Sequence, residues 1–233
     1  MLNTDNIKVL AFDADDTLWD NQTHYDNAGD RLCEILAPYG DKEYIEGELF
    51  RTECANMADL GFGGKAFTIS MVETALRVSG GKVSAHDIGK ILEAGKEVLT
   101  MAMLPFPDVE TTLGQIRESG KYRMVLLTKG ELLPQQNKVQ RSGLAGYFDE
   151  VKIVADKTPD VYAELYREFC ITPEEFLMVG NSMKSDIIPV IETGGYGIYI
   201  PFHRTWKMEH AEEVEHGNMT RAEKFSDLTG ILL

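Results

Sequence analysis

The fold is decided by the stretch IKVLAFDADDTL, residues 7–18. Its first half is mostly apolar and rich in β-branched side chains, which predicts a short buried strand. The strand ends in three carboxylates within four positions, Asp13, Asp15 and Asp16. Such carboxylates repel one another unless a cation lies among them, and oxygen ligands alone favour a hard ion, with Mg²⁺ the first choice. The alternative is that these acids cap a following helix and are otherwise solvated.

Apolar runs of strand length recur further along the chain, at residues 124–127, 151–154, 176–179 and 197–200. Helical stretches separate these runs, and continuous apolar strands that alternate with helices predict a parallel α/β sheet covered on both faces. The first two strands are separated by a far longer interval than one crossover needs. We interpret this interval as a helical insert, because it carries helical patterns at residues 21–37, 41–58, 66–78 and 85–101.

The composition excludes several classes of protein. The 233 residues carry 38 acidic and 23 basic side chains, a net charge of −15, and a field of this sign repels nucleic acids and anionic membranes. We therefore expect neither as a partner. The three cysteines, Cys33, Cys54 and Cys170, are widely spaced and form no CxxC pair, so neither a disulfide framework nor a zinc site is indicated. The sequence shows no secretory signal and no membrane-spanning apolar run, and we expect a cytoplasmic protein.

Polar residues that follow the predicted strands are the candidates for a functional site, because ligands of parallel α/β sheets bind beyond the carboxyl ends of the strands. These residues are Asp13, Asp15, Asp16, Thr128, Lys129, Lys157, Asn181 and Asp186. The set contains no histidine and no cysteine. A carboxylate that lies next to Mg²⁺ and an ammonium group can act as a nucleophile.

Four short motifs, in this order, resemble those of the haloacid dehalogenase-like hydrolase superfamily. They are DADDTL at residues 13–18, LT at 127–128, KTPD at 157–160, and VGNS at 179–182 followed by Asp186. Each motif ends a predicted strand, so the resemblance spans essentially the whole chain. It implies a Rossmann-like α/β core with a parallel sheet, residues 1–19 and 105–233, and an inserted α-helical cap domain, residues 20–104.

The resemblance also implies catalytic roles. Asp13 would attack phosphorus to form an aspartyl-phosphate, and Asp15 would protonate the leaving oxygen and later activate water. Thr128 would donate a hydrogen bond to a phosphoryl oxygen, and Lys157 would pair with both Asp13 and the phosphate. These roles are chemically sound, because the phosphoryl charge needs a cation on each flank and a two-step path needs an acid that becomes a base.

The metal ligands implied by the resemblance are Asp13, the backbone carbonyl of Asp15, Asn181 and Asp186, and the metal would be Mg²⁺. Position 181 is ordinarily an aspartate in the superfamily. Asparagine keeps a ligand oxygen there but removes a negative charge, which weakens attraction to a divalent ion. A second departure is Asp16, which replaces a common glycine.

Two lysines are predicted to bind substrate. Lys129 follows the threonine of the second motif, where the superfamily frequently has asparagine, and it adds a positive charge near the expected phosphate position. Lys65 ends the glycine-rich break at residues 61–65, which we interpret as the substrate-facing loop of the cap. The alternative is that these glycines only end one helix and start the next.

The acid at position 15 distinguishes among the activities of the superfamily. Members that remove halide from carbon generally lack it, since halide needs no proton, so Asp15 favours hydrolysis of a phosphate ester. We expect a Mg²⁺-dependent phosphatase that acts on a small phosphorylated metabolite, because an inserted cap encloses its substrate. The alternatives are a phosphomutase, a catalytically weak binding or regulatory relative in which Asn181 marks lost activity, and a 2-haloacid dehalogenase, which is less favoured.

Overall fold

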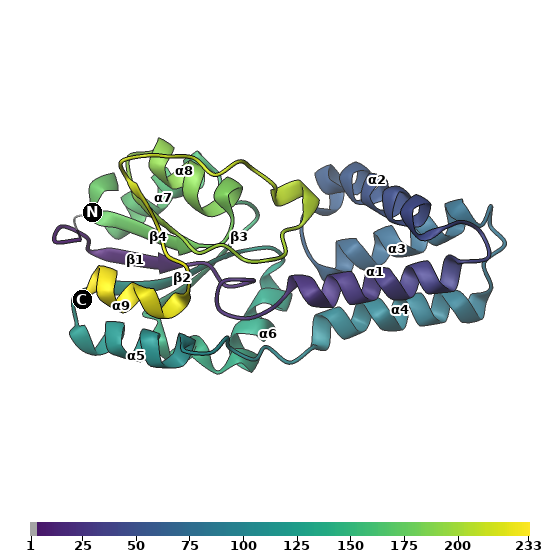
Figure 1. Ribbon diagram of the computed structural model, residues 1–233, viewed down its shortest axis with the longest axis horizontal. Coiled ribbons are helices and arrows are strands. Elements are labelled where there is room, and N and C mark those ends of the chain that lie inside the picture. The colour runs from purple at the N-terminus through teal and green to yellow at the C-terminus, as the bar shows by residue number, and fades with distance from the viewer. Residues whose placement is uncertain (1–3) are drawn as a thin grey trace. The chain divides into compact units, whose positions relative to one another are not determined.

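The computed structural model describes residues 4–233, and within them six strands form one parallel sheet (Figure 1). The strands are β1 (Val9–Phe12), β2 (Arg123–Lys129), β3 (Glu150–Val154), β4 (Phe176–Gly180), β5 (Tyr196–Tyr199) and β6 (Met219–Arg221). Their order across the sheet is β3-β2-β1-β4-β5-β6, and every neighbouring pair is parallel. The predicted α/β class with a parallel sheet is confirmed. The sequence pattern missed β6, because its three residues are only partly buried and form no apolar run.

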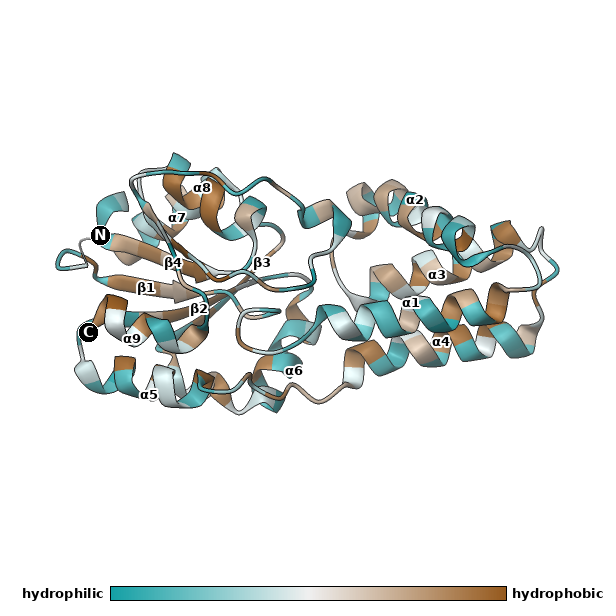
Figure 2. Ribbon diagram, viewed as in Figure 1, coloured by the Kyte–Doolittle hydropathy of each residue, from teal (hydrophilic) through white to brown (hydrophobic). Residues whose placement is uncertain are grey.

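The central strand β1 is buried on both faces of the sheet. Val9 and Ala11 belong to a core cluster that also includes residues of α7 (Pro159–Phe169) and α8 (Ile188–Glu192). On the other face the ring of Phe12 lies 5.9 Å from that of Phe148 and 6.0 Å from that of Phe225, measured between centroids. The helices α5 (Val109–Ser119) and α9 (Leu228–Leu232) cover that face, as Figure 1 shows. Figure 2 shows the apolar strands between these two helical layers.

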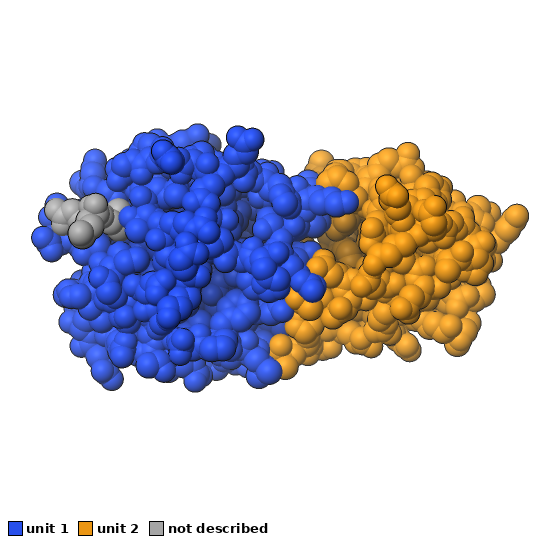
Figure 3. All heavy atoms as spheres, viewed as in Figure 1, with its two compact units in different colours: residues 1–22, 103–233 blue, residues 23–102 orange. Residues whose placement is uncertain are grey.

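Residues 23–102 form a compact unit of their own, distinct from the unit made of residues 1–22 and 103–233 (Figure 3). Its helices are α1 (Gln22–Leu36), α2 (Lys42–Leu60), α3 (Gly64–Val78) and α4 (Ala85–Thr100). They share an apolar core in which the rings of Tyr25 and Phe67 lie 5.0 Å apart. Among the described residues no helix is long and apolar enough to cross a membrane.

The helix α6 (Leu132–Ser142) was not predicted from the sequence. Its buried face consists mainly of polar side chains, Gln135, Lys138 and Ser142, with Val139 as the apolar member. An amphipathic helix is recognised by an apolar stripe, and this helix buries a polar one. Apolar periodicity therefore does not reveal α6, although this helix contacts Asp15.

Candidate functional site

The candidate site lies where the chain order across the sheet reverses. From β1 the chain passes to β2 and β3 on one side and to β4 and β5 on the other, which is the switch point at which open α/β sheets bind ligands. Four of the predicted site residues occupy the carboxyl ends of neighbouring strands. Asp13 follows β1, Thr128 lies near the end of β2, Lys157 follows β3 and Asn181 follows β4.

Asp13 and Lys157 form a buried ion pair at this end of the sheet. The Lys157 Nζ atom lies 2.5 Å from Oδ1 of Asp13 and 2.7 Å from Oδ1 of Asp186, and its side chain is 1% exposed. Burial, which outweighs the attraction of the Lys157 ammonium, raises the pKa of Asp13 to about 7. Burial lowers the pKa of Lys157, but the two carboxylates outweigh it and raise this pKa to about 12. The ammonium therefore stays charged between two acids.

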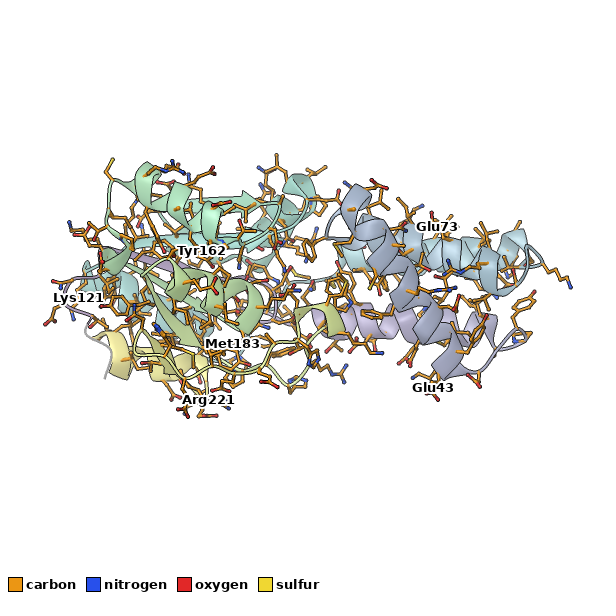
Figure 4. The ribbon with its side chains drawn as sticks, turned by 90° about the horizontal axis from the view of Figure 1, so that it is seen from above. Glu43, Glu73, Lys121, Tyr162, Met183 and Arg221 are labelled. Carbon is orange, nitrogen blue, oxygen red and sulfur yellow. The ribbon has the colours of Figure 1, made fainter. Side chains whose placement is uncertain are left out.

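Asp186 is held by the chain that follows β4. Its Oδ2 accepts a hydrogen bond of 2.9 Å from the backbone N–H of Ser182, while its Oδ1 accepts from Lys157. A Cβ atom at Gly180 would lie 2.2 Å from Oδ2 of Asp186, so only glycine fits there. The hydroxyl of Tyr162, on α7 and labelled in Figure 4, donates to the backbone carbonyl of Ser185 over 3.1 Å. Both oxygens of Asp186 thus have protein partners, and the residue positions Lys157.

Thr17 connects Asp13 to Asn181. The Thr17 hydroxyl donates to Oδ2 of Asp13 over 2.8 Å and lies 3.1 Å from Oδ1 of Asn181. The backbone N–H of Asn181 donates to the same hydroxyl oxygen over 3.1 Å. Two of the predicted metal-ligating oxygens therefore meet at one hydroxyl. The sequence pattern contained Thr17 within the first motif but assigned it no role.

Asp15 has its own lysine, which comes from α6. Its Oδ2 accepts from Lys138 Nζ over 2.7 Å and from Gln135 Nε2 over 3.1 Å, and its Oδ1 accepts from Trp19 Nε1 over 2.8 Å. Burial raises the pKa of Asp15, but the Lys138 ammonium and these hydrogen bonds outweigh it, and the net pKa is lowered. Gln135 Nε2 also lies 2.6 Å from Oγ1 of Thr128. Asp15, the predicted acid, and Thr128, predicted to bind the phosphoryl group, thus both contact the side-chain nitrogen of Gln135.

Asp16 supports the backbone of the site. Its Oδ1 accepts hydrogen bonds of 2.8 and 2.9 Å from the backbone N–H groups of Asn21 and Gln22, where α1 begins. Its φ of 62° lies in the left-handed region, which explains why a glycine would also serve at this position. Burial, together with the neighbouring carboxylates, raises the pKa of Asp16 to about 7 despite these hydrogen bonds.

Lys129 is paired with an acid from the far end of the chain. Its ammonium contacts Glu209 in the connection between β5 and β6, and it lies 2.8 Å from Oγ of Ser185. Glu209 also accepts hydrogen bonds of 2.7 Å from the hydroxyls of Ser182 and Ser185. Burial raises the pKa of Glu209, but Lys129 and the hydroxyls outweigh it and lower this pKa overall. Glu209 was missed because residues 209–216 have the composition of a solvated acidic loop.

Lys65 belongs to the other compact unit. It is exposed in the first turn of α3, directly after the glycine break that ends α2. Asp13, Asp15 and Thr128 belong to the unit of residues 1–22 and 103–233.

The donor set suits a small hard cation. Among the described residues no three His, Cys, Asp or Glu side chains group as a metal cluster. The candidate oxygen ligands are the predicted ones, Asp13, Asn181, Asp186 and the backbone carbonyl of Asp15, and both carboxylates also accept hydrogen bonds from protein donors on each oxygen. Mg²⁺ is commonly held by one or two carboxylates with several waters, so this sparse set fits it. Burial raises the pKa of Asp13, and a divalent ion beside it would favour the ionised form.

Comparison with known proteins gives consistent matches. Residues 7–191 match the family model described as haloacid dehalogenase-like hydrolase. A glyceraldehyde 3-phosphate phosphatase of Methanothermobacter thermautotrophicus is 24% identical over 97% of this chain and 100% of its own. A phosphoglycolate phosphatase of Vibrio parahaemolyticus is 25% identical over 91% of this chain and 90% of its own. The crystal structure of a haloacid dehalogenase-like family hydrolase from Xanthomonas campestris matches with a TM-score of 0.88 and 32% identity, covering 97% of this chain and 91% of that one.

Proposed function

The chain belongs to the haloacid dehalogenase-like hydrolase family, and we propose that it is a Mg²⁺-dependent phosphatase that hydrolyses a small phosphate monoester. The observation that carries this proposal is the pair of carboxylates Asp13 and Asp15, each with its own buried lysine partner. The first acid is placed to attack and the second to handle protons. Relatives that carry the names of phosphatases acting on small phosphorylated compounds support the same substrate class.

The proposed reaction proceeds in two displacements at phosphorus. A carboxylate oxygen of Asp13 forms a bond to phosphorus while the bond from phosphorus to the leaving oxygen breaks, and Asp15 donates a proton to that oxygen. Asp15 then takes a proton from a water molecule whose oxygen attacks the aspartyl-phosphate, and the bond between phosphorus and Asp13 breaks. Inorganic phosphate leaves, and Asp13 returns to its carboxylate form.

The remaining residues stabilise the charge of the phosphoryl group and keep the reacting groups in position. Lys157 stabilises negative charge on the phosphoryl group while it fixes Asp13, and Thr128 donates a hydrogen bond to a phosphoryl oxygen. Asp13, Asn181, Asp186 and the Asp15 carbonyl would hold Mg²⁺, which when bound would supply a second positive charge near the phosphoryl group. Asp186 also fixes Lys157. We place the substrate-facing loop of the cap at residues 61–65, with Lys65 as its charged member.

The proposal is tested by assaying the purified protein for phosphate release from an aryl phosphate and from a panel of small phosphorylated metabolites, with Mg²⁺ and with a chelator. We expect Mg²⁺-dependent release of inorganic phosphate and a loss of more than about 10²-fold in Asp13→Asn, because an amide is a poor nucleophile. The exposed Asp160→Asn is the matched control. Chloride release from a 2-haloacid without phosphatase activity, or more than a tenth of wild-type activity in Asp13→Asn, would contradict the proposal.

A further inference from the structure

The buried polar face of α6 is aimed at the candidate site. Gln135 and Lys138 are 4% and 6% exposed, and their spacing of three residues places them on one face of the helix. Burying an ammonium group costs several kcal/mol unless it is paired. Lys138 Nζ lies 2.7 Å from Oδ2 of Asp15 and 2.8 Å from Oδ1 of Asn21. Asp15 therefore supplies the negative charge that makes this burial tolerable.

Gln135 joins two parts of the site that are far apart in sequence. Its Nε2 atom lies 3.1 Å from Oδ2 of Asp15, 2.6 Å from Oγ1 of Thr128 and 3.0 Å from the carbonyl oxygen of Lys129. Trp19 Nε1 holds the other carboxylate oxygen of Asp15 at 2.8 Å. Both oxygens of Asp15 are thus fixed by donors, which restricts rotation of its carboxyl group.

We propose that Lys138 and Gln135 are positioning residues that hold Asp15 for proton transfer to the leaving group. This inference rests on the proposed function, since it gives Asp15 the role of acid. A proton donor works only within hydrogen-bond distance of the oxygen it protonates, and a small displacement of a catalytic group lowers the rate steeply. The alternative is that the two residues only anchor α6 to the loop after β1.

The leaving group distinguishes positioning from anchoring. An alkyl phosphate releases a strongly basic alkoxide, so breaking its ester bond requires a proton from Asp15. p-Nitrophenyl phosphate releases a stabilised phenolate that leaves without a proton. The value of kcat/KM reports the steps up to formation of the aspartyl-phosphate, where the leaving group departs. A displaced Asp15 therefore lowers the ratio of kcat/KM for the alkyl over the aryl substrate, whereas general damage to the site lowers both values together.

The experiment measures this ratio for the wild type, Lys138→Met and Gln135→Met, with an alkyl phosphate identified by the panel above and p-nitrophenyl phosphate. We expect the ratio to fall about 10-fold in Gln135→Met, which leaves the charge beside Asp15 unchanged, a part of the ~10²–10⁴ that acid–base catalysis contributes. We expect a smaller fall in Lys138→Met, because losing the ammonium also favours the protonated form of Asp15. Lys138→Arg keeps a charged donor and is expected to retain more of the ratio than Lys138→Met. Lys152→Met is the control and should leave the ratio unchanged. It removes a lysine of β3 that pairs with Glu150 of the same strand and with Glu168 of α7.

Asp15→Asn, measured in parallel, separates failure of the inference from failure of the proposed function. If Asp15→Asn does not lower the ratio, Asp15 is not the acid and the proposed mechanism fails. If Asp15→Asn lowers the ratio but Lys138→Met and Gln135→Met reduce both substrates equally, the positioning role is overturned. If Lys138→Met does not fold, the ratios measured for Gln135→Met and Lys138→Arg decide whether the positioning role holds. Combining Gln135→Met with Asp15→Asn should produce no further fall in the ratio, because the group being positioned is already lost.

Discussion

Replacement of Lys157 by methionine tests the ion cluster on which the site depends. Methionine preserves most of the packing but leaves Asp13 and Asp186, which are 7% and 1% exposed, facing each other without a cation. Removing one partner of a buried ion pair typically costs about 3–5 kcal/mol, and we expect the free energy of unfolding to fall by that amount. We expect activity to fall by about 10²-fold or more, because a charge-assisted contact to the phosphoryl group is lost as well.

The stability assay can be confined to the unit that carries the site. Both tryptophans of the chain, Trp19 and Trp206, belong to the unit of residues 1–22 and 103–233, so tryptophan fluorescence in a denaturant titration reports its unfolding. Lys8→Met is the matched control. Lys8 pairs with Glu175 over 2.5 Å, but its side chain is 63% exposed, and exposed pairs contribute about 0–1 kcal/mol.

A double-mutant cycle with Asp186→Asn identifies the source of the loss. If the cost of Lys157→Met comes from uncompensated charge, removing the charge of Asp186 as well relieves part of it, and the double variant loses less than the two single variants together by about 1–3 kcal/mol. A loss in Lys157→Met no larger than that in Lys8→Met would refute the argument. So would additive losses in the cycle, since Lys157 and Asp186 would then act independently.

Two further predictions concern the metal and the cysteines. Asn181→Asp adds a negative charge to the ligand set, so the Mg²⁺ concentrations for half-maximal activity and for half-maximal thermal stabilisation should both fall about 10-fold; superimposable titrations would mean that Asn181 does not ligate the ion directly. Cys33 is 6% exposed and burial raises its pKa to about 11, whereas Cys54 and Cys170 are exposed. A thiol reagent at pH 8 should therefore label those two quickly and Cys33 only after unfolding, and equal labelling rates in the folded protein would contradict the placement of Cys33.

The elements that could be predicted from the sequence are those whose buried side chains are apolar. The run at residues 9–12 is fully buried on both faces, and its hydropathy alone predicts a central strand. The helices of residues 23–102 share an apolar core and show the matching periodicity. The helix α6 buries Gln135 and Lys138 instead, and the strand β6 is too short and too exposed to form an apolar run. Both were missed for the same physical reason, since neither has an apolar pattern.

The residues of the candidate site also fall into two groups, those that a local sequence pattern predicts and those that it does not. Asp13 could be predicted because it directly follows the apolar strand β1, and Lys157 because it lies in the segment just after β3. Parallel strands bring their carboxyl ends together. Glu209 and Lys138 reach the site from a loop and from a helix face, so their contacts depend on tertiary packing that no local pattern records. The sequence did hold a signal for Thr17, because this hydroxyl side chain lies in the same short motif as Asp13, to which it donates a hydrogen bond.

The different environments of the two acids follow from the two lysines that reach them. Asp13 is almost fully buried and shares Lys157 with Asp186, so burial outweighs the attraction of the ammonium and its pKa is raised. Asp15 is only partly buried and has Lys138 and two neutral donors, so its pKa is lowered. The lowered pKa of Asp15 favours its ionised form, which suits the second proposed step, in which Asp15 takes a proton from water. The contrast identifies the acid whose ionised form burial disfavours. That acid is Asp13, the proposed nucleophile, and its second oxygen is directed through Thr17 toward Asn181, where the proposed cation would bind.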